Sequence, residues 1–329
     1  MVSTGINGFG RFGLHLLKYW LDNRKQASFS IDYINDETLT PENALSIILG
    51  DRFVTISKTH RVTLEGDCIT FSAPSGQNET IQFTQTEKQR IPWRGQPDLL
   101  LECSGRYCQA QSNREYLQGA TKRILISATV ADADQTLVVG FNHHTFDKNA
   151  RIISYGSCII NAFVPLTNWI HQQFHIQECD TTVIHNMPEH QLLKPENRSL
   201  QRRPCSLEWM GPRLLSYLSP NNFTVLKTYI PYPGISMIDM RYRLTTPPDQ
   251  DRFVQLFTEA CQGGPLKGLY STDRPGDEPE SHLNTPFSAT LRHDGYRFIG
   301  KNLYLSCYFD NENSVNRFFD LIQFLTDQD

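Results

Sequence analysis

Two groups of residues in this sequence have the types and spacing that chemistry requires. The first is the glycine pattern Gly8-x-Gly10-x-x-Gly13, which follows an apolar run at 2–6 and opens a helical pattern. Such a turn brings backbone N–H groups and the positive end of a helix against a pyrophosphate. Asp36 lies about 20 residues further on, where a carboxylate can accept hydrogen bonds from a ribose. The pattern predicts a dinucleotide-binding site; the alternative is a glycine-rich turn with a solvated aspartate.

The second group joins a thiol to an imidazole. Cys158 precedes a helix expected over 162–174, and the unpaired N–H groups of a helix start stabilise a thiolate. We therefore expect the pKa of this thiol to be lowered. His185 ends the apolar strand pattern 181–184 and can act as base for the thiol and for a covalent intermediate. The alternatives are a buried structural cysteine and a loop histidine without a partner.

The elements that must position the first group have the rhythm of an α/β fold. Residues 1–157 alternate apolar runs with helical patterns, which predicts a Rossmann-type doubly wound parallel sheet. A meander of short antiparallel strands is expected over 54–83, and 110–117 is an amphipathic stretch of the kind that forms a helix. The expected parallel strands cover 2–6, 30–34, 99–103, 123–126, 136–139 and 151–154.

The second group lies in a region of longer alternating runs. These predict a mostly antiparallel sheet, so that residues 158–312 are expected to form an α+β catalytic domain. A C-terminal helix within 313–329 is expected to complete the first domain. Two proline-containing stretches, 187–212 and 271–286, are predicted to be loops. The strands are expected at 223–230, 236–244, 287–291 and 304–309, with a helix at 250–260.

Composition excludes several classes of protein. The chain has 329 residues, enough for two domains, and its 39% hydrophobic and 20% charged content is typical of a globular protein. A formal net charge of −4 argues against nucleic acid or an anionic membrane as partners. The eight cysteines form no CxxC pair, and no apolar run reaches membrane-spanning length or resembles a signal peptide. We expect a cytoplasmic protein with reduced thiols and no metal site.

Ordered motifs along nearly the whole chain resemble those of the glyceraldehyde-3-phosphate dehydrogenase superfamily, in places nearer to its erythrose-4-phosphate dehydrogenase branch. The glycine turn and the spacing from Cys158 to His185 both fit that family. A shared family does not by itself establish a shared activity. The other matching segments are 34–36, 103–105, 140–143, 157–161, 231–233 and 309–312.

The resemblance implies a mechanism, a cofactor and an assembly. Cys158 would attack the carbonyl of a small aldehyde, by default a phosphorylated sugar, and His185 would be the base while hydride passes to NAD. The carboxylate of Asp36 would repel a 2′-phosphate, so NAD is expected over NADP. The stretch 187–212 resembles the family's interface loop, which implies a homotetramer. The cofactor residues implied are Gly8, Phe9, Gly10, Arg11 and Phe12 at the pyrophosphate, Asp36 at the ribose, Ser127 near the cofactor and Asn311 at the nicotinamide.

The phosphate-binding part departs from the family pattern. Ile159 and Ile160 stand where two threonines are usual, Tyr229 stands where an arginine is expected, and the loop before a helix is expected to be shortened around 210–213. Four candidates remain for binding substrate or an anion, namely Ser157, His190, Arg203 and Tyr229. The alternatives left open are phosphate or water as acyl acceptor, a reductase running the same chemistry backwards, and a non-catalytic NAD-binding relative with a regulatory or interaction role.

Overall fold

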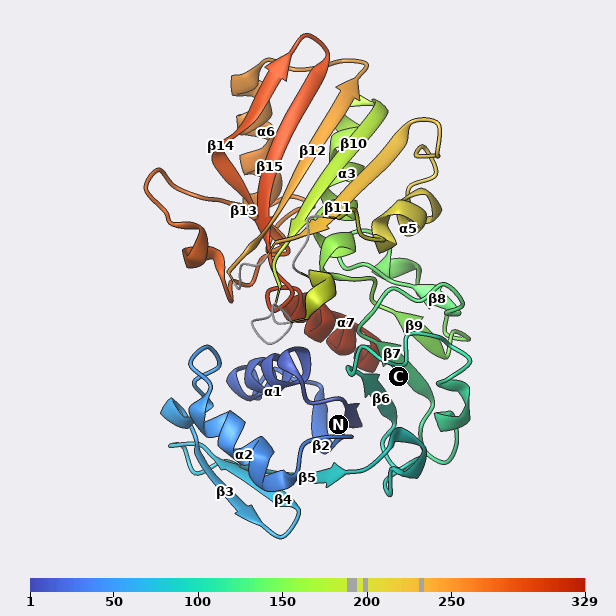
Figure 1. Cartoon of the computed structure of the whole chain (residues 1–329), viewed down its shortest axis with the longest axis vertical. Coiled ribbons are helices and arrows are strands. Elements are labelled where there is room, and N and C mark those ends of the chain that lie inside the picture. The colour runs from blue at the N-terminus through green and yellow to red at the C-terminus, as the bar shows by residue number, and fades with distance from the viewer. Residues whose placement is uncertain (188–193, 198–200, 231–233, 329) are drawn as a thin grey trace. The chain divides into compact units, whose positions relative to one another are not determined.

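The chain divides into two compact units (Figure 1). The structure is a computed structural model, and it describes residues 1–187, 194–197, 201–230 and 234–328. Unit 1 comprises Met1–Leu137, His143–Gly156 and Val315–Asp329, and unit 2 comprises Val138–Asn142 and Ser157–Ser314. The roles expected for the two domains, NAD binding over 1–157 with 313–329 and catalysis over 158–312, stay predictions.

Unit 1 is built on a long, mostly parallel sheet. Its strands are β1 (Val2–Asn7), β2 (Phe29–Asp36), β3 (Arg61–Glu65), β4 (Cys68–Ser72), β5 (Asn78–Gln85), β6 (Leu99–Glu102), β7 (Arg123–Ile126), β8 (Gln135–Thr136) and β9 (Ile152–Ser154). Within the described residues they lie in the order β3-β4-β5-β2-β1-β6-β7-β9-β8. β3, β4 and β5 form the expected antiparallel meander, and the pairs from β5 to β8 are parallel. β1 lies inside the sheet, and the glycine turn begins at Gly8, the residue after its end.

Three helices accompany this sheet: α1 (Arg11–Asp22), α2 (Pro41–Gly50) and α7 (Val315–Asp327). α1 buries one apolar face, with Leu16, Leu17 and Trp20 fully inaccessible. The Phe12 ring of α1 meets the Phe318 ring of α7 edge to face, with centroids 5.2 Å apart. This packing and a hydrogen bond from the Ser28 backbone to the Gln323 side chain attach the C-terminal helix to unit 1.

The stretch 110–117 forms only a short 3₁₀ turn at Arg114–Tyr116, so the expectation of a helix there is wrong. The cause is local. The side-chain amide of Asn113 donates hydrogen bonds to the backbone carbonyls of Tyr107 and Gln109, at 2.9 and 2.7 Å. Side-chain bonds of this kind compete with the helical ladder.

Unit 2 is built on a mixed sheet. Its strands are β10 (Ile176–His185), β11 (Phe223–Tyr229), β12 (Ser236–Leu244), β13 (Tyr270–Thr272), β14 (Ala289–Ile299) and β15 (Asn302–Phe309). They lie in the order β11-β10-β12-β15-β14-β13 within the described part of the chain. The pairs β10–β12, β12–β15 and β14–β15 are antiparallel, whereas β10–β11 and β13–β14 are parallel. The predicted fold class, a Rossmann-type α/β unit with a second, mostly antiparallel α+β unit, is confirmed.

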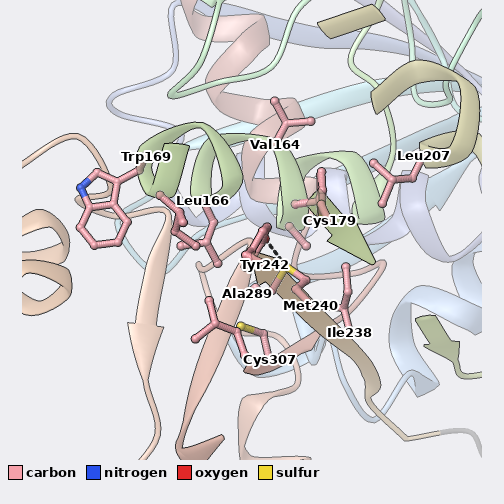
Figure 2. Packing of buried hydrophobic residues seen from close by; sticks show 14 of the residues in the cluster. Val164, Leu166, Trp169, Cys179, Leu207, Ile238, Met240, Tyr242, Ala289 and Cys307 are labelled. Carbon is pink, nitrogen blue, oxygen red and sulfur yellow. Dashed lines mark hydrogen bonds between the residues drawn. The ribbon is translucent and has the colours of Figure 1, made fainter. Parts of the chain in front are cut away.

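One face of this sheet is covered by helices α3 (Cys158–Phe174) and α6 (Gln250–Gln262), and α5 (Ser206–Leu214) lies beside α3. The Trp169 ring of α3 lies 5.9 Å from that of Phe257 in α6. Figure 2 shows buried side chains of α3, α5, β10, β12, β14 and β15 packed together. This apolar core fixes the start of α3 and the end of β10, where Cys158 and His185 stand.

α5 corrects the prediction of a continuous loop over 187–212. It begins at Ser206, and Leu207 and Met210 are buried in the core. The expected shortening of a loop around 210–213 relative to the family stays a prediction. Residues 188–193 and 198–200 of the same stretch lie outside the described residues. β14 begins close to the expected place but runs eleven residues, well beyond the predicted 287–291.

Candidate functional site

The glycine turn of unit 1 connects the end of β1 to the start of α1. Gly8 has a φ of +99°, and a Cβ there would lie 2.4 Å from the backbone of Ser104, so only glycine fits. Gly10 is the N-cap residue of α1, and a Cβ at Gly10 would meet no atom within 4 Å. Among the described residues no side chain caps this helix start. An open, uncapped start is the arrangement that lets a phosphate group approach backbone N–H groups.

Asp36 stands at the end of β2 beside this turn. Its Oδ2 accepts a hydrogen bond from the Phe9 backbone N–H at 2.8 Å, and its Oδ1 accepts from the backbone and hydroxyl of Thr38. Burial alone would raise the pKa of this carboxyl, but the donors at Phe9 and Thr38 outweigh it, and the pKa lies below its usual value. Asp36 is therefore ionised at neutral pH and also holds the glycine turn in place.

Gly8, Gly10 and Asp36 line a cavity of about 130 Å³ together with Glu37. The Glu37 carboxylate accepts hydrogen bonds from the Tyr107 hydroxyl at 2.5 Å and from Arg106 Nη1 at 2.6 Å. The bond from Tyr107 is the main cause that lowers the pKa of Glu37. Two ionised carboxylates thus face one cavity, which disfavours an extra phosphate there. Sequence reasoning missed Glu37, although it directly follows Asp36.

A buried ion pair supports the walls of this cavity. Lys88 Nζ donates to Glu102 Oε2 and to Asn113 Oδ1, each at 2.6 Å, and both charged side chains are essentially inaccessible. Burial lowers the pKa of Lys88, and the charge of Glu102 opposes that shift. Glu102 also accepts from the Asn7 side chain at 2.8 Å and from the Ser104 backbone at 2.9 Å, two residues that line the cavity. No sequence spacing indicates this pair, because Lys88 begins a short 3₁₀ helix whereas Glu102 ends the separate strand β6.

The side chains of Arg11, Phe9 and Phe12, three further predicted cofactor residues of unit 1, contact other residues of the protein. Arg11 Nη1 forms an ion pair with Asp51 at 2.9 Å. The rings of Phe9 and Phe12 pack edge to face on Phe83 and on Phe318, respectively. Ser127 follows β7 directly, and its backbone N–H donates to the Glu102 carbonyl at 2.9 Å. Any contact of Arg11, Phe9 or Phe12 with a pyrophosphate would therefore be made by the backbone.

In unit 2 the structure brings Cys158 and His185 together. Cys158 is the first residue of α3, His185 is the last residue of β10, and Cys158 Sγ lies 3.7 Å from His185 Nε2. His185 Nδ1 lies 2.8 Å from the Asn186 carbonyl oxygen, which can only accept a hydrogen bond. In the neutral ring Nδ1 therefore carries the proton, and Nε2 is free to accept one from the thiol. The geometry is that of a nucleophile and its base.

The electrostatics of this pair differ from the sequence expectation. Burial raises the pKa of the Cys158 thiol to about 12, and the nearby charge of Lys227 lowers it only in part. Burial also lowers the pKa of His185 to about 4, with Lys227 acting in the same direction. The expectation of a lowered thiol pKa is therefore wrong for the free chain, because loss of hydration outweighs the helix start. At neutral pH the pair is a thiol and a neutral imidazole.

Two side chains of β11 lie next to this pair. The Tyr229 ring meets the His185 ring edge to face, with centroids 5.5 Å apart, and Lys227 Nζ lies 4.9 Å from the centre of the Tyr229 ring. Sequence reasoning selected Tyr229 but missed Lys227. The signal that could have found it is the alternation along β11, which places Lys227 on the same face as Val225 and Tyr229.

Of the other residues predicted to bind an anion, Ser157 lies at the start of α3 and Arg203 lies beside β11. Ser157 is the N-cap residue of α3, where its Oγ accepts a hydrogen bond from the Ile160 backbone at 3.3 Å. The same Oγ lies 3.3 Å from Ser206 Oγ at the start of α5. The Arg203 backbone N–H donates to the Lys227 carbonyl at 2.8 Å, which places Arg203 beside β11. His190 lies outside the described residues.

Asn311 belongs to a segment that follows β15 and lies beside the end of β10. The adjacent Phe309 ring packs on His185 with centroids 5.7 Å apart, and the side chain of Asn186 lies 3.5 Å from Asp310 Oδ1. The Asn311 backbone N–H donates to Asp310 Oδ1 at 2.8 Å. The segment that carries Asn311 is thus fixed near the Cys158–His185 pair.

Searches of the described residues found no group of three or more His, Cys, Asp or Glu side chains arranged to hold a metal ion. They also found no helix with the length and hydropathy required to cross a bilayer.

The chain is similar over its full length to several proteins that share one name. The chain is 24% identical over 352 residues to glyceraldehyde-3-phosphate dehydrogenase 2 of Trichormus variabilis, covering 100% of this chain and 99% of that protein. It is 25% identical to the glyceraldehyde-3-phosphate dehydrogenases of Mycobacterium avium and Neurospora crassa, over 98% and 100% of this chain and 97% and 98% of theirs. The chain is a distant, full-length relative of glyceraldehyde-3-phosphate dehydrogenases. No family model matches it.

This similarity supports the glyceraldehyde-3-phosphate dehydrogenase superfamily as the group to which the chain is related. It covers both units, because the matched region spans the glycine turn of unit 1 and the Cys158–His185 pair of unit 2. It does not select the erythrose-4-phosphate dehydrogenase branch.

Proposed function

We propose that this chain is an NAD-dependent oxidoreductase that oxidises a phosphorylated sugar aldehyde through a covalent bond to Cys158. The observation that carries the proposal is the 3.7 Å contact between Cys158 Sγ and an Nε2 of His185 that is left free to accept a proton. It is supported by full-length similarity to proteins named glyceraldehyde-3-phosphate dehydrogenase.

The residues of unit 2 carry the covalent chemistry. His185 Nε2 accepts the thiol proton while Cys158 Sγ bonds to the aldehyde carbon, and the proton passes to the former carbonyl oxygen. When that hydroxyl is oxidised, Nε2 accepts its proton, and a thioester to Cys158 remains. Attack on the thioester by phosphate then releases an acyl phosphate, attack by water releases the free acid, and either returns the thiol. A neutral thiol and a neutral imidazole are the correct protonation states for the first step.

The residues of unit 1 fit a nicotinamide dinucleotide. Gly8 and Gly10 leave room for a pyrophosphate at the start of α1, and the ionised Asp36 faces the same cavity. Bound NAD would supply the hydride acceptor. Asp36 and Glu37 favour NAD over NADP, since both carboxylates would repel a 2′-phosphate. Asn311 is proposed to bind the nicotinamide, and Ser127 to lie near the cofactor.

The resemblance of the sequence motifs adds two further features to the proposal. These are glyceraldehyde 3-phosphate or erythrose 4-phosphate as the aldehyde, and a homotetramer as the assembly. Ultracentrifugation of the purified protein tests the assembly: a species of four chains supports it, and a monomer contradicts it.

A non-catalytic, NAD-binding role is the second candidate. The observations that favour it are the thiol pKa of about 12 and the buried Ile159 and Ile160 beside Cys158, which offer no side-chain donor to a phosphate. Retention of Cys158 and His185 in direct contact favours the enzyme, because a binding protein has no need of that pair.

The experiment that separates the two measures NADH formation by the purified protein. NAD is mixed with glyceraldehyde 3-phosphate or with erythrose 4-phosphate, each with and without inorganic phosphate. Turnover that needs phosphate identifies phosphate as the acyl acceptor, and turnover without it identifies water. Tight NAD binding with no turnover on either aldehyde would contradict the proposed reaction and favour the non-catalytic role.

A further inference from the structure

β11 carries a lysine on the face where its neighbours are apolar. Phe223 and Val225 of this strand are buried in the core of unit 2, at 7% and 2% exposure, while the alternate Leu226 is 49% exposed. Because strand side chains alternate between the two faces of a sheet, Lys227 and Tyr229 lie on the same face as the buried Phe223 and Val225. Its ammonium group is thereby held on the side of the sheet where α3 and α5 begin.

The charge of Lys227 has no counterion in the described part of the chain. Neighbouring cations do have one: Arg202 pairs with Glu208, and Arg241 pairs with Asp180 at 2.8 Å. The ammonium of Lys227 instead lies 4.9 Å from the Tyr229 ring, whose edge contacts His185. A half-buried cation kept in one place without a carboxylate is poised to receive an anion.

The same charge acts on three reactive groups at once. After the effect of burial, Lys227 is the largest influence on the pKa of Cys158 and on that of His185, and it lowers both. It also lowers the pKa of Cys205, the N-cap residue of α5.

Two helix starts bring further donors to this place. α3 begins at Cys158 and α5 at Ser206, and the hydroxyls of Ser157 and Ser206 lie 3.3 Å apart. The Arg203 backbone is hydrogen-bonded to the Lys227 carbonyl, so the segment that leads into α5 runs along β11. Two helix starts, two hydroxyls and the Lys227 ammonium therefore lie beside the Cys158–His185 pair, and together they suit a doubly charged oxyanion. Two carboxylates oppose them: the charge of Asp310 acts on Cys158, and that of Glu312 acts on His185.

We propose that Lys227 binds the phosphate-type anion that reacts or is carried beside Cys158, and that the same ammonium sets the reactivity of the thiol. This rests on the proposed function, because it names the residue that recognises the anion of that reaction. The anion is either the phosphate ester of the aldehyde or free inorganic phosphate. Lys227 thus supplies the positive charge that Tyr229 and Ile159 cannot supply.

The test uses the full chain without aldehyde or NAD. The rate of alkylation of Cys158 by iodoacetamide is followed by mass spectrometry of its peptide between pH 6 and 10. The measurement is repeated with inorganic phosphate and with glycerol 3-phosphate, a phosphate ester that has no aldehyde. The variants are Lys227→Met, Lys227→Arg, Leu226→Lys, and the double change Lys227→Met with Leu226→Lys, which keeps the net charge but moves it to the other face.

We expect phosphate or the ester to protect wild-type Cys158, and whichever protects identifies the source of the anion. Lys227→Met should lose that protection and slow alkylation at pH 8 by about three- to tenfold, because the thiolate loses its nearest cation. Lys227→Arg and Leu226→Lys should behave like the wild type, and the double variant like Lys227→Met. Should Lys227→Met fail to fold, Lys227→Gln takes its place, with thermal unfolding as the check.

Three results would overturn the proposal. They are no protection of the wild type by either anion, unchanged protection in the Lys227 variant, and recovery of protection when the charge is moved to position 226. None of them depends on turnover. An active enzyme with unprotected Cys158 would therefore reject the role of Lys227 and leave the proposed function standing.

Discussion

Charged side chains have partners within the protein at the cavity of the glycine turn, whereas the lysine beside Cys158 has no ion-pair partner among the described residues. In unit 1 the buried Lys88 is matched by Glu102, and Asp36 is satisfied by backbone donors. In unit 2 Lys227 has no counterion among the described residues, and the thiol and imidazole beside it are both held neutral by burial. The side-chain charges of the first site are thus satisfied within the protein, although the start of α1 stays uncapped, whereas we propose that an anion neutralises Lys227 in the second.

The two sites differ in which part of the chain forms them. The glycine turn is fixed by backbone geometry, since a Cβ at Gly8 would collide with the chain. The anion site depends on side-chain donors, which can move from one strand position to another. Replacement of an expected arginine by Tyr229 therefore does not by itself remove the charge, because Lys227 stands two residues earlier on the same face.

The largest expected effect separates the two sites completely. Cys158→Ser should lower turnover by about 10⁴-fold or more, because the hydroxyl is a far weaker nucleophile than the thiol. NAD affinity should change by less than about twofold, since Cys158 is not among the residues proposed to bind NAD. Turnover and isothermal titration measure these quantities, and Cys68→Ser in β4 is the matched control. Turnover close to that of the wild type would disprove the covalent mechanism.

His185→Asn tests the base without removing the nucleophile. We expect turnover to fall by about 10²- to 10⁴-fold, because the variant loses the Nε2 that lies 3.7 Å from the thiol and accepts its proton. Stopped-flow measurement of NADH formation follows the step, and the exposed His144→Asn serves as control. A loss of less than threefold would show that His185 is not the base.

Lys88→Met tests the paired character of the cofactor site. It leaves the Glu102 carboxylate buried and unpaired, so the free energy of unfolding should fall by about 3–5 kcal/mol. Urea denaturation measures the loss. The double change Lys88→Met with Glu102→Gln also removes the negative charge of the unpaired carboxylate, so it should recover part of the lost free energy of unfolding. Equal losses in the single and double variants would contradict the ion-pair account.

A pH titration tests the neutral imidazole. The pKa of His185 is lowered from 6.5 to about 4, so its contribution to stability is present above pH 6.5 and is lost as the pH falls towards 4. The full loss is about 3 kcal/mol. The wild type should therefore lose more stability over this range than His185→Asn, as measured by urea denaturation at each pH. Parallel profiles for the two proteins would mean that His185 is not buried in its neutral form.

The smallest effect concerns the choice of cofactor. Asp36→Ala should weaken NAD binding by about 10- to 100-fold, since it removes one charged hydrogen bond to the ribose and loosens the turn at Phe9. Asp36→Asn, which keeps one acceptor oxygen, should lose less. Calorimetric titration of each variant with NAD and with NADP measures the two affinities. Unchanged NAD affinity in Asp36→Ala would place the ribose elsewhere.

Local patterns were sufficient to predict the fold class and the two main groups of chemical residues. The glycine turn, Asp36, Cys158 and His185 all stand at ends of regular elements that hydrophobic periodicity reveals. Contacts between distant segments were not predictable in this way. Lys88, in a short 3₁₀ helix, meets Glu102 of β6 only when these separate segments assemble. The amide of Asn113 replaces helical bonds that the pattern at 110–117 favours.

The same limit explains the errors at the anion site. The prolines of 187–212 indicated a loop, yet Pro212 lies in the last turn of α5, where it breaks few helical bonds. The thiol pKa was expected to fall because a helix start is visible in the sequence, whereas the burial that raises it depends on the packed core.

The most direct test of the central claim is to trap the covalent intermediate. The protein is mixed with NAD and glyceraldehyde 3-phosphate without inorganic phosphate, quenched in acid within milliseconds to seconds, and its peptides are analysed by mass spectrometry. The account predicts an acyl group on the peptide that contains Cys158, dependent on NAD and absent from Cys158→Ser. Formation of NADH with no adduct on Cys158, or an adduct on another cysteine, would contradict it.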